Sequence, residues 1–240
     1  MVEVYLGVDP KQWLIGEVLR YSLLKRTKAK VNFHNLALLD LKEPLKTPTP
    51  SFSRWFIPYF QNYQGKAIYL DLATLVLDDI ETLWNTPFQD FGALACPIQG
   101  ERGEKSVGFK TNVMLLDCSK LTHWKPSVWL TVSFQNPASV EKTMRAMPGG
   151  LSAKDFSPLP EEWNQEEGKR EEGAESKAKI LHFKNPLTYP WLSEQNPHKA
   201  LFLKELREAI EHQQIPLAAI LLEMEAKRIY PKLLEEMMAI

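Results

Sequence analysis

The stretch from Gly65 to Trp84 constrains the fold of this 240-residue chain more than any other. An apolar run, 67–70, ends in the acid Asp71, and a second apolar run leads to Asp78, Asp79 and a short amphipathic segment. Such runs, bounded by polar residues, predict buried strands, and the segment after Asp79 predicts a helix. A buried strand that ends in a carboxylate is typical of an open α/β sheet, because ligands bind beyond the carboxyl ends of its strands.

The N-terminal region predicts a parallel βαβ unit. Residues 2–8 are apolar and β-branched and end at Asp9, which indicates a strand with an acid at its end. Residues 11–25 place apolar side chains, Trp13 among them, at helical spacing, and residues 31–33 predict a second strand. Taken alone, Asp9 beside Pro10 is more typical of a turn or a helix cap than of a ligand contact.

The rest of the chain continues the α/β pattern. Further strands are expected at residues 92–96, 111–117 and 180–183, a helix after Ser51, and helices from Pro197 to the end. Loops are expected at residues 99–110, 156–164 and 165–179, the last of them solvated and mobile. The charged residues of the first and last helices, among them Lys25, Arg26 and Glu205, are expected to face solvent.

Composition limits the classes of function. The net charge of −1 gives no field that would attract nucleic acid or an anionic membrane. The two cysteines, Cys96 and Cys118, form neither a metal-binding spacing nor a disulfide framework. There is no N-terminal signal pattern and no apolar run near the roughly 20 residues of a membrane span. We therefore expect a cytoplasmic protein without nucleic-acid partners or a transmembrane segment.

Two blocks of the central stretch resemble glycosyltransferase family 8, the glycogenin and lipopolysaccharide galactosyltransferase type. Residues 69–73 read Tyr-Leu-Asp-Leu-Ala, where the family reads Tyr-Leu-Asp-Ala-Asp. Residues 75–84 fit the family pattern Leu-Val-x-x-Asp-Ile-x-x-Leu-Trp. The second metal-binding Asp of the family falls on Ala73, so the Asp-x-Asp motif is incomplete.

Other blocks follow in the family's order. They are Asp9 before Val-Leu-x-x-Ser, residues 52–58, which resemble the family's Arg-Phe-x-x-Pro segment and read Arg-Trp-Phe-Ile-Pro at 54–58, the strand 111–117, Leu-Pro-x-x-Trp-Asn at 159–164, and His-Phe with a following Pro-Trp at 182–191. The resemblance extends from Val2 to about Pro231. The Asp-Gln-Asp motif that family members often carry is not found in residues 121–150.

The resemblance implies a single GT-A domain over residues 1–240, with a mixed, mainly parallel sheet flanked by helices and a helical part from about 197. It implies retaining transfer of a hexose from a nucleotide-diphosphate sugar, with UDP as the expected nucleotide, to an unknown glycan, protein or small molecule. Asp71 and His182 would hold Mn²⁺ or Mg²⁺. The donor would contact Asp9 and Lys11 at the base, Arg54 and Lys184 at the phosphates, and Lys110, Thr111 and Asn112 at the sugar. The catalytic residue is unknown.

Ala73 keeps alternatives open. One alternative is that Asp78 or Asp79 supplies the missing ligand, although both suit the start of a helix better. A second alternative is that phosphates and water complete the coordination, and a third is that Arg54 and Lys184 neutralise the diphosphate without a metal. A second hypothesis is a catalytically degenerate domain that binds a nucleotide sugar or a protein partner without turnover. On pattern alone, His182 is more typical of a structural histidine.

Overall fold

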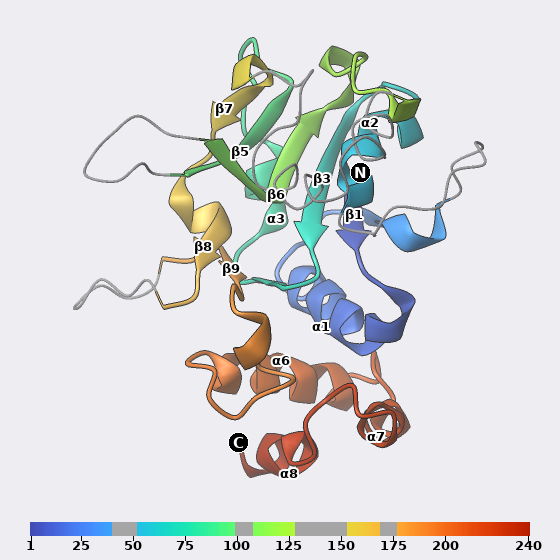
Figure 1. Ribbon diagram of the computed structural model, residues 1–240, viewed down its shortest axis with the longest axis vertical. Helices are drawn as coiled ribbons and strands as arrows, with labels where there is room; N and C mark the ends of the chain where they lie inside the picture. The colour runs from blue at the N-terminus through green and yellow to red at the C-terminus, as the bar shows by residue number, and fades with distance from the viewer. Residues whose placement is uncertain (40–51, 99–107, 128–152, 169–176) are drawn as a thin grey trace. The chain divides into compact units, whose positions relative to one another are not determined.

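The computed structural model describes residues 1–39, 52–98, 108–127, 153–168 and 177–240 (Figure 1). The chain divides into two compact units, and each combines separate segments of the sequence. The large-sheet unit comprises Met1–Val8, Ala29–Asp71 and Glu81–Asn164. The helical unit comprises Asp9–Lys28, Leu72–Ile80 and Gln165–Ile240. The single domain expected over residues 1–240 stays a prediction.

A six-stranded mixed sheet, in the order β2-β1-β3-β6-β5-β7, forms the centre of the large-sheet unit (Figure 1). Its strands are β1 Val2–Gly7, β2 Val31–Asn35, β3 Lys66–Asp71, β5 Ala93–Ile98, β6 Gly108–Asp117 and β7 Phe156–Pro158. β1 pairs in parallel with β2 and β3, and β5 pairs in parallel with β7. β6 is antiparallel to β3 and β5. The sheet is therefore mainly parallel, as the sequence predicts.

An aromatic cluster packs on one face of this sheet. Trp55 and Trp124 are fully buried with ring centroids 5.2 Å apart. They share this core with Tyr5, Tyr69 and Met114, which are paired residues of β1, β3 and β6. Trp55 lies in the 3-10 helix η3 Phe52–Phe56, which continues into α2 Ile57–Phe60. The helix expected after Ser51 is thus mostly 3-10.

Short helices complete the unit. Its other helices are η2 Leu36–Leu38, η5 Cys118–Lys120, η6 Ala153–Asp155 and η7 Glu161–Asn164, and α3 Ile80–Trp84 begins at its border. Two loop predictions are corrected in part. β6 already begins at Gly108, and residues 156–158 form β7, because the backbone of each segment pairs with β5.

The helical unit holds a three-stranded sheet in the order β4-β9-β8. Its strands are β4 Thr74–Val76, β8 Gln165–Glu166 and β9 Ile180–His182. Its helices are η1 Pro10–Gln12, α1 Trp13–Leu24, η8 Pro186–Thr188, α6 Lys199–Glu211, α7 Leu217–Glu225 and α8 Leu233–Ala239. The strand β8 lies within the segment expected to be a loop, of which residues 169–176 lie outside the described ranges.

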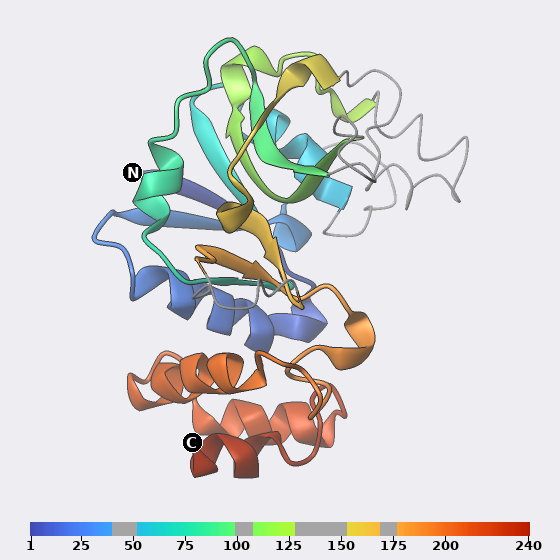
Figure 2. The same cartoon turned by 90° about the vertical axis from the view of Figure 1, so that its left-hand side faces the viewer.

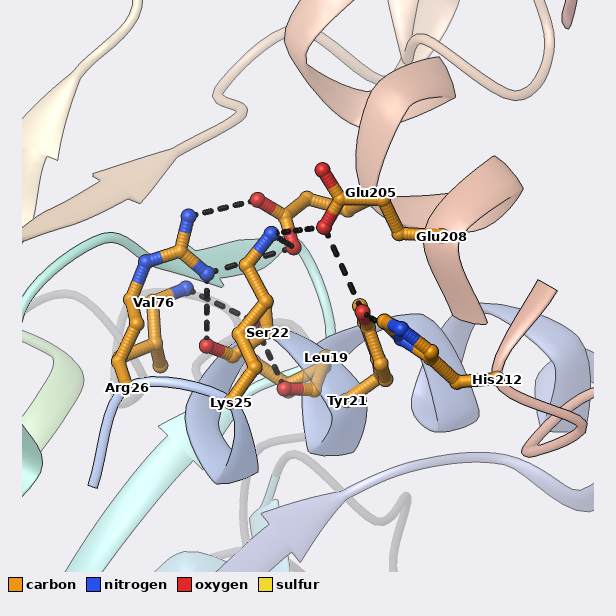
Figure 3. Close-up of polar contacts among 9 residues, drawn as sticks. All are labelled: Leu19, Tyr21, Ser22, Lys25, Arg26, Val76, Glu205, Glu208 and His212. Atoms are coloured by element: carbon orange, nitrogen blue, oxygen red, sulfur yellow. Dashed lines mark hydrogen bonds and ion pairs between the residues drawn. The ribbon is translucent and has the colours of Figure 1, made fainter. Parts of the chain in front are cut away.

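Helix α1 joins the elements of this unit. Ser22 donates from its hydroxyl to the carbonyl of Leu19 at 2.8 Å and accepts from the amide of Val76, on the edge strand β4, at 3.1 Å (Figure 3). α6, in orange in Figure 2, runs beside α1, in blue, and α8 packs on α6. Phe202 of α6 packs with Phe183 and Trp191 in an aromatic core, with ring centroids 5.5–6.4 Å apart.

Among the described residues, no helix is both long enough and apolar enough to cross a membrane.

Candidate functional site

The strand order of the large sheet places a topological switch point beside Asp71. From β1 the sheet continues on one side to β2 and on the other to β3, so the strand order reverses between β1 and β3. Ligands of open α/β sheets bind beyond the carboxyl ends of the strands at such a switch point. β1 ends at Gly7 and β3 ends at Asp71, and these two residues are direct partners in the parallel register.

Two side chains of the described ranges donate to the Asp71 carboxylate. Its Oδ2 accepts from Nη2 of Arg54 at 3.1 Å and from the hydroxyl of Tyr69 at 3.2 Å. The Asp71 side chain keeps 15% exposure, so it is accessible from one side. Gly7 leaves room for the hydroxyl, because a Cβ at this position would lie 2.6 Å from the Tyr69 oxygen.

Arg54 is buried, with 2% exposure. Its Nη1 donates to the carbonyl of Thr111 at 2.6 Å and lies 3.2 Å from the Thr111 hydroxyl. The guanidinium stacks on the Tyr69 ring at 4.6 Å from the centroid. Complete burial raises the pKa of Tyr69 well above its usual value, with a further contribution from the Asp71 charge against a lowering by Arg54. Tyr69 is thus a neutral hydrogen-bond donor across the physiological range.

The three residues expected at the donor sugar lie together at the start of β6. Thr111 is 4% exposed and holds Arg54, whereas Asn112 is half-buried. The ammonium of Lys110 lies 3.6 Å from the carboxylate of Glu161, and its side chain is 10% exposed. The Lys110 carbonyl accepts from the amide of Asn164, a fully buried residue of the Leu-Pro-x-x-Trp-Asn block.

In the helical unit, His182 lies at the centre of a row across the small sheet. Thr74 and Glu166 are its direct register partners on β4 and β8. Directly paired residues project from the same face of a sheet, so the imidazole, a hydroxyl and a carboxylate are neighbours on one face. Ala73 also lies next to this strand, because its carbonyl accepts from the amide of Phe183 at 2.8 Å.

Lys184 follows this strand and contacts Glu166. Its ammonium lies 3.0 Å from Oε2 of Glu166, while its side chain is 65% exposed. Exposed ion pairs of this kind contribute little to stability. The neighbouring Glu167 accepts from the backbone amides of Lys184 and Asn185, each at 2.9 Å, and so fixes the start of this segment.

The two residues expected at the nucleotide base lie at the start of α1. Asp9 caps the 3-10 helix η1, because its carboxylate accepts from the Lys11 amide at 2.8 Å. Lys11 is exposed. The spacing predicts Trp13 on the apolar face of the helix, whereas the structure leaves this residue 40% exposed.

Asp78 and Asp79 precede α3. Oδ1 of Asp78 accepts from the Asp79 amide at 2.8 Å, and its Oδ2 lies 3.8 Å from the ammonium of Lys179. Within the described ranges, no group of three or more His, Cys, Asp or Glu side chains is arranged to hold a metal ion.

Sequence reasoning missed three residues of these arrangements: Gly7, Tyr69 and Glu166. The alternation of β3 could have found Tyr69, since residues two apart on a strand share a face and Asp71 was already singled out. The roles of Gly7 and Glu166 depend on strand pairing between distant segments, which carries no local signal.

Comparison with known sequences gives a short match. No family model matches this chain. The curated protein "Protein CDI" of Arabidopsis thaliana is 30% identical over 89 residues, which cover 33% of this chain and 34% of that protein. The chain therefore matches about a third of the length of this curated relative.

Comparison with solved structures identifies the fold. The galactosyltransferase LgtC, in a structure with donor and acceptor sugar analogs, superposes with a TM-score of 0.61 at 15% identity, over 86% of this chain and 95% of LgtC. The glycosyltransferase GlyE of Streptococcus pneumoniae TIGR4 superposes with a TM-score of 0.59 at 18% identity, over 96% of this chain and 65% of GlyE. The bifunctional glycosyltransferase WbbM gives a TM-score of 0.60 at 13% identity, over 85% of this chain and 49% of WbbM. The fold is thus the GT-A fold of glycosyltransferases, as the sequence predicts.

Proposed function

We propose that this chain is a glycosyltransferase that moves a hexose, with retention, from a nucleotide-diphosphate sugar, UDP-linked, to a glycan, protein or small-molecule acceptor. One observation carries the proposal: Asp71 lies at the switch point of a sheet with the GT-A fold, opposite Gly7. A carboxylate at this place has the chemistry to bind a cation or a sugar hydroxyl.

The departing diphosphate sets the chemical demand on the site. Negative charge grows on its oxygens as the bond to the sugar breaks, and a bound Mn²⁺ or Mg²⁺ supplies positive charge there. Carboxylates and an imidazole suit Mn²⁺. Asp71 and His182 are the proposed ligands, as the resemblance implies.

Glu166 is our candidate for the carboxylate that position 73 lacks. It is the register partner of His182 and projects from the same face of the small sheet. The neighbouring Lys184 neutralises it in part, at 3.0 Å, and a cation would compete with this exposed ammonium. Ala73 is 4% exposed, so a carboxylate at position 73 would be buried. Its negative charge would then need a bound cation or an ion pair to offset the cost of desolvation.

The remaining contacts are assigned by position. Asp9, Lys11 and the exposed indole of Trp13 would meet the base, because an exposed aromatic face next to polar groups suits stacking and hydrogen bonding together. Lys184, with its exposed ammonium, would meet the phosphates. Lys110, Thr111 and Asn112 would line the sugar.

A second function, a nucleotide-sugar-binding or protein-interaction module without turnover, is favoured by one specific observation. Position 73 carries Ala where the family has its second metal-binding Asp. A domain with a weakened cation site would bind a donor and transfer nothing.

A thermal-shift panel tests the proposal. UDP, GDP, ADP and their sugars are added to the whole chain with and without Mn²⁺, and a ligand at 100 times its Kd adds about 2.7 kcal/mol of stability. We expect a shift with a UDP species that grows with Mn²⁺ and disappears in Asp71→Asn. The exposed Asp90→Asn is the matched control and keeps the shift. Absence of any shift with wild type would reject nucleotide binding and leave only the protein-interaction function.

A further inference from the structure

Arg54 is arranged to hold a protein carboxylate. The side chain is 2% exposed, its guanidinium is stacked on the Tyr69 ring, and its two terminal nitrogens bond to Thr111 and Asp71. A phosphate contact would require Arg54 to exchange these partners. The Thr111 carbonyl fixes the guanidinium through Nη1, and Nη2 then gives Asp71 a single charge-assisted hydrogen bond of set direction.

Tyr69 adds a second, neutral donor to the same oxygen. Its hydroxyl donates to Oδ2 of Asp71 at 3.2 Å, next to the bond from Arg54 at 3.1 Å. Two donors on one carboxylate oxygen restrict rotation of the side chain. The Asp71 side chain is only 15% exposed, so solvent competes weakly for these bonds.

Gly7 makes the arrangement of Tyr69 possible. A Cβ at position 7 would lie 2.6 Å from the Tyr69 oxygen and 3.3 Å from two of its ring carbons. Such a contact is too short, and Tyr69 is fully buried in the core, so any side chain at position 7 would displace the hydroxyl from Asp71. The lack of a side chain at Gly7 therefore lets the Tyr69 hydroxyl reach Asp71.

We propose that Gly7, Arg54 and Tyr69 are positioning residues that hold the Asp71 carboxylate in one orientation at the switch point. The inference rests on the proposed function for what Asp71 binds. It predicts that the Tyr69 hydroxyl contributes to donor binding without touching the donor, and that Arg54 acts through Asp71 and not on the diphosphate.

The binding test uses Tyr69→Phe, which removes one oxygen and keeps the ring beneath Arg54. Tyr5→Phe is the matched control, since Tyr5 is the buried register partner of Tyr69 on β1. In titrations of UDP with Mn²⁺, we expect Tyr69→Phe to raise the Kd about tenfold, the loss of a hydrogen bond to a charged group, and Tyr5→Phe to leave it unchanged. Equal affinity of Tyr69→Phe and wild type would overturn the inference.

Gly7→Ala gives a second, independent variant. We expect it to weaken binding as much as Tyr69→Phe does, and the double variant to be no weaker than either single one, because both changes remove the same hydrogen bond. Additive losses would show that Gly7 acts on the ligand directly and would contradict its positioning role.

A stability cycle separates this inference from the proposed function. Tyr69→Phe and Asp71→Ala, alone and combined, are compared by urea denaturation without ligand, with Asp71→Ser in place of Asp71→Ala if the latter does not fold. We expect the two changes to be coupled by at least about threefold in the unfolding constant. Coupling in a protein that binds no nucleotide would reject the proposed function and keep the positioning set; absence of coupling would reject the positioning set whatever the protein binds.

Discussion

The two cysteine thiols have lost their reactivity through burial. Cys96 and Cys118 are both fully buried, and burial raises the pKa of each to about 12. At pH 8 only about one thiol in ten thousand is then ionised, and the thiolate is the reactive form. We expect neither cysteine to react with a thiol reagent such as iodoacetamide in the native protein, and both to react in urea. Mass spectrometry counts the labels, and a rapidly labelled native thiol would contradict the burial.

Arg54 shows what residue-scale reasoning from the sequence can and cannot supply. The sequence identified the residue through the family block at 54–58, and the resemblance assigned it to the phosphates of the donor. Its burial follows from Asp71 and Thr111, which lie 17 and 57 positions away in the chain. A local pattern carries no information on such partners, so the residue was predictable and its environment was not.

At the scale of elements, one glutamate joins α1 to α6. The Glu205 side chain is 1% exposed and lies 2.9 Å from the ammonium of Lys25 and 2.6 Å from Nη2 of Arg26 (Figure 3). The ammonium of Lys25 also donates to the Glu208 carboxylate, and the Tyr21 hydroxyl donates to the same carboxylate at 3.4 Å. Removing the buried Glu205 carboxylate would break its ion pairs with Arg26 and Lys25, although Lys25 would keep its pair with Glu208.

We therefore expect Glu205→Ala to lower the free energy of unfolding by about 3 kcal/mol. The matched control on the same helix is Glu211→Ala, which removes an exposed pair with Arg207 and should cost less than about 1 kcal/mol. Urea denaturation measures both. Equal losses would show that Glu205 stabilises the helix itself and not its contact with α1.

The strands and helices were predicted better than their charged contacts. β1, β3, β6 and β9 match their apolar runs, because a buried strand marks itself by composition. Glu205, Lys25 and Arg26 were expected in solvent, since each lies among charged neighbours in the sequence. Their pairing depends on two helices about 180 residues apart, as the separation of 179 between Arg26 and Glu205 shows. β7 was missed for the same reason, because its three residues form a strand only through β5.

At the scale of the whole molecule, the division into two units is the feature that the sequence did not indicate. Each unit is built from three segments, and α1, between the paired strands β1 and β2, belongs to the helical unit. Patterns along a chain predict elements and their order, whereas compactness depends on contacts among all of them. The pH dependence of the stability of the whole chain can still be predicted, because the pKa values of titrating groups in both units are shifted in defined directions.

At the acid end, two carboxylates of the helical unit stabilise the folded state. A hydrogen bond from Lys25 lowers the pKa of Glu208, and a hydrogen bond from Lys199 lowers that of Glu236. A lowered pKa contributes stability above the unfolded value of about 4.5, and that stability is lost as the pH falls through the folded value. We expect the free energy of unfolding, measured in urea, to fall below pH 4.5, and to fall less steeply in Glu208→Gln.

At the alkaline end the sign reverses. Burial raises the pKa of Tyr21 from 10.0 to about 12, with the charge of Glu208 adding to it, and the two cysteines shift from 9.0 to about 12. Groups with a raised pKa contribute stability that is complete below the unfolded value and lost as the pH rises toward the folded one. The free energy of unfolding should therefore decline from about pH 9 upward. Tyr21→Phe removes one contributor, so its curve should decline less above pH 10, and a wild-type curve that stays flat from pH 8 to 11 would contradict the burial of all three groups.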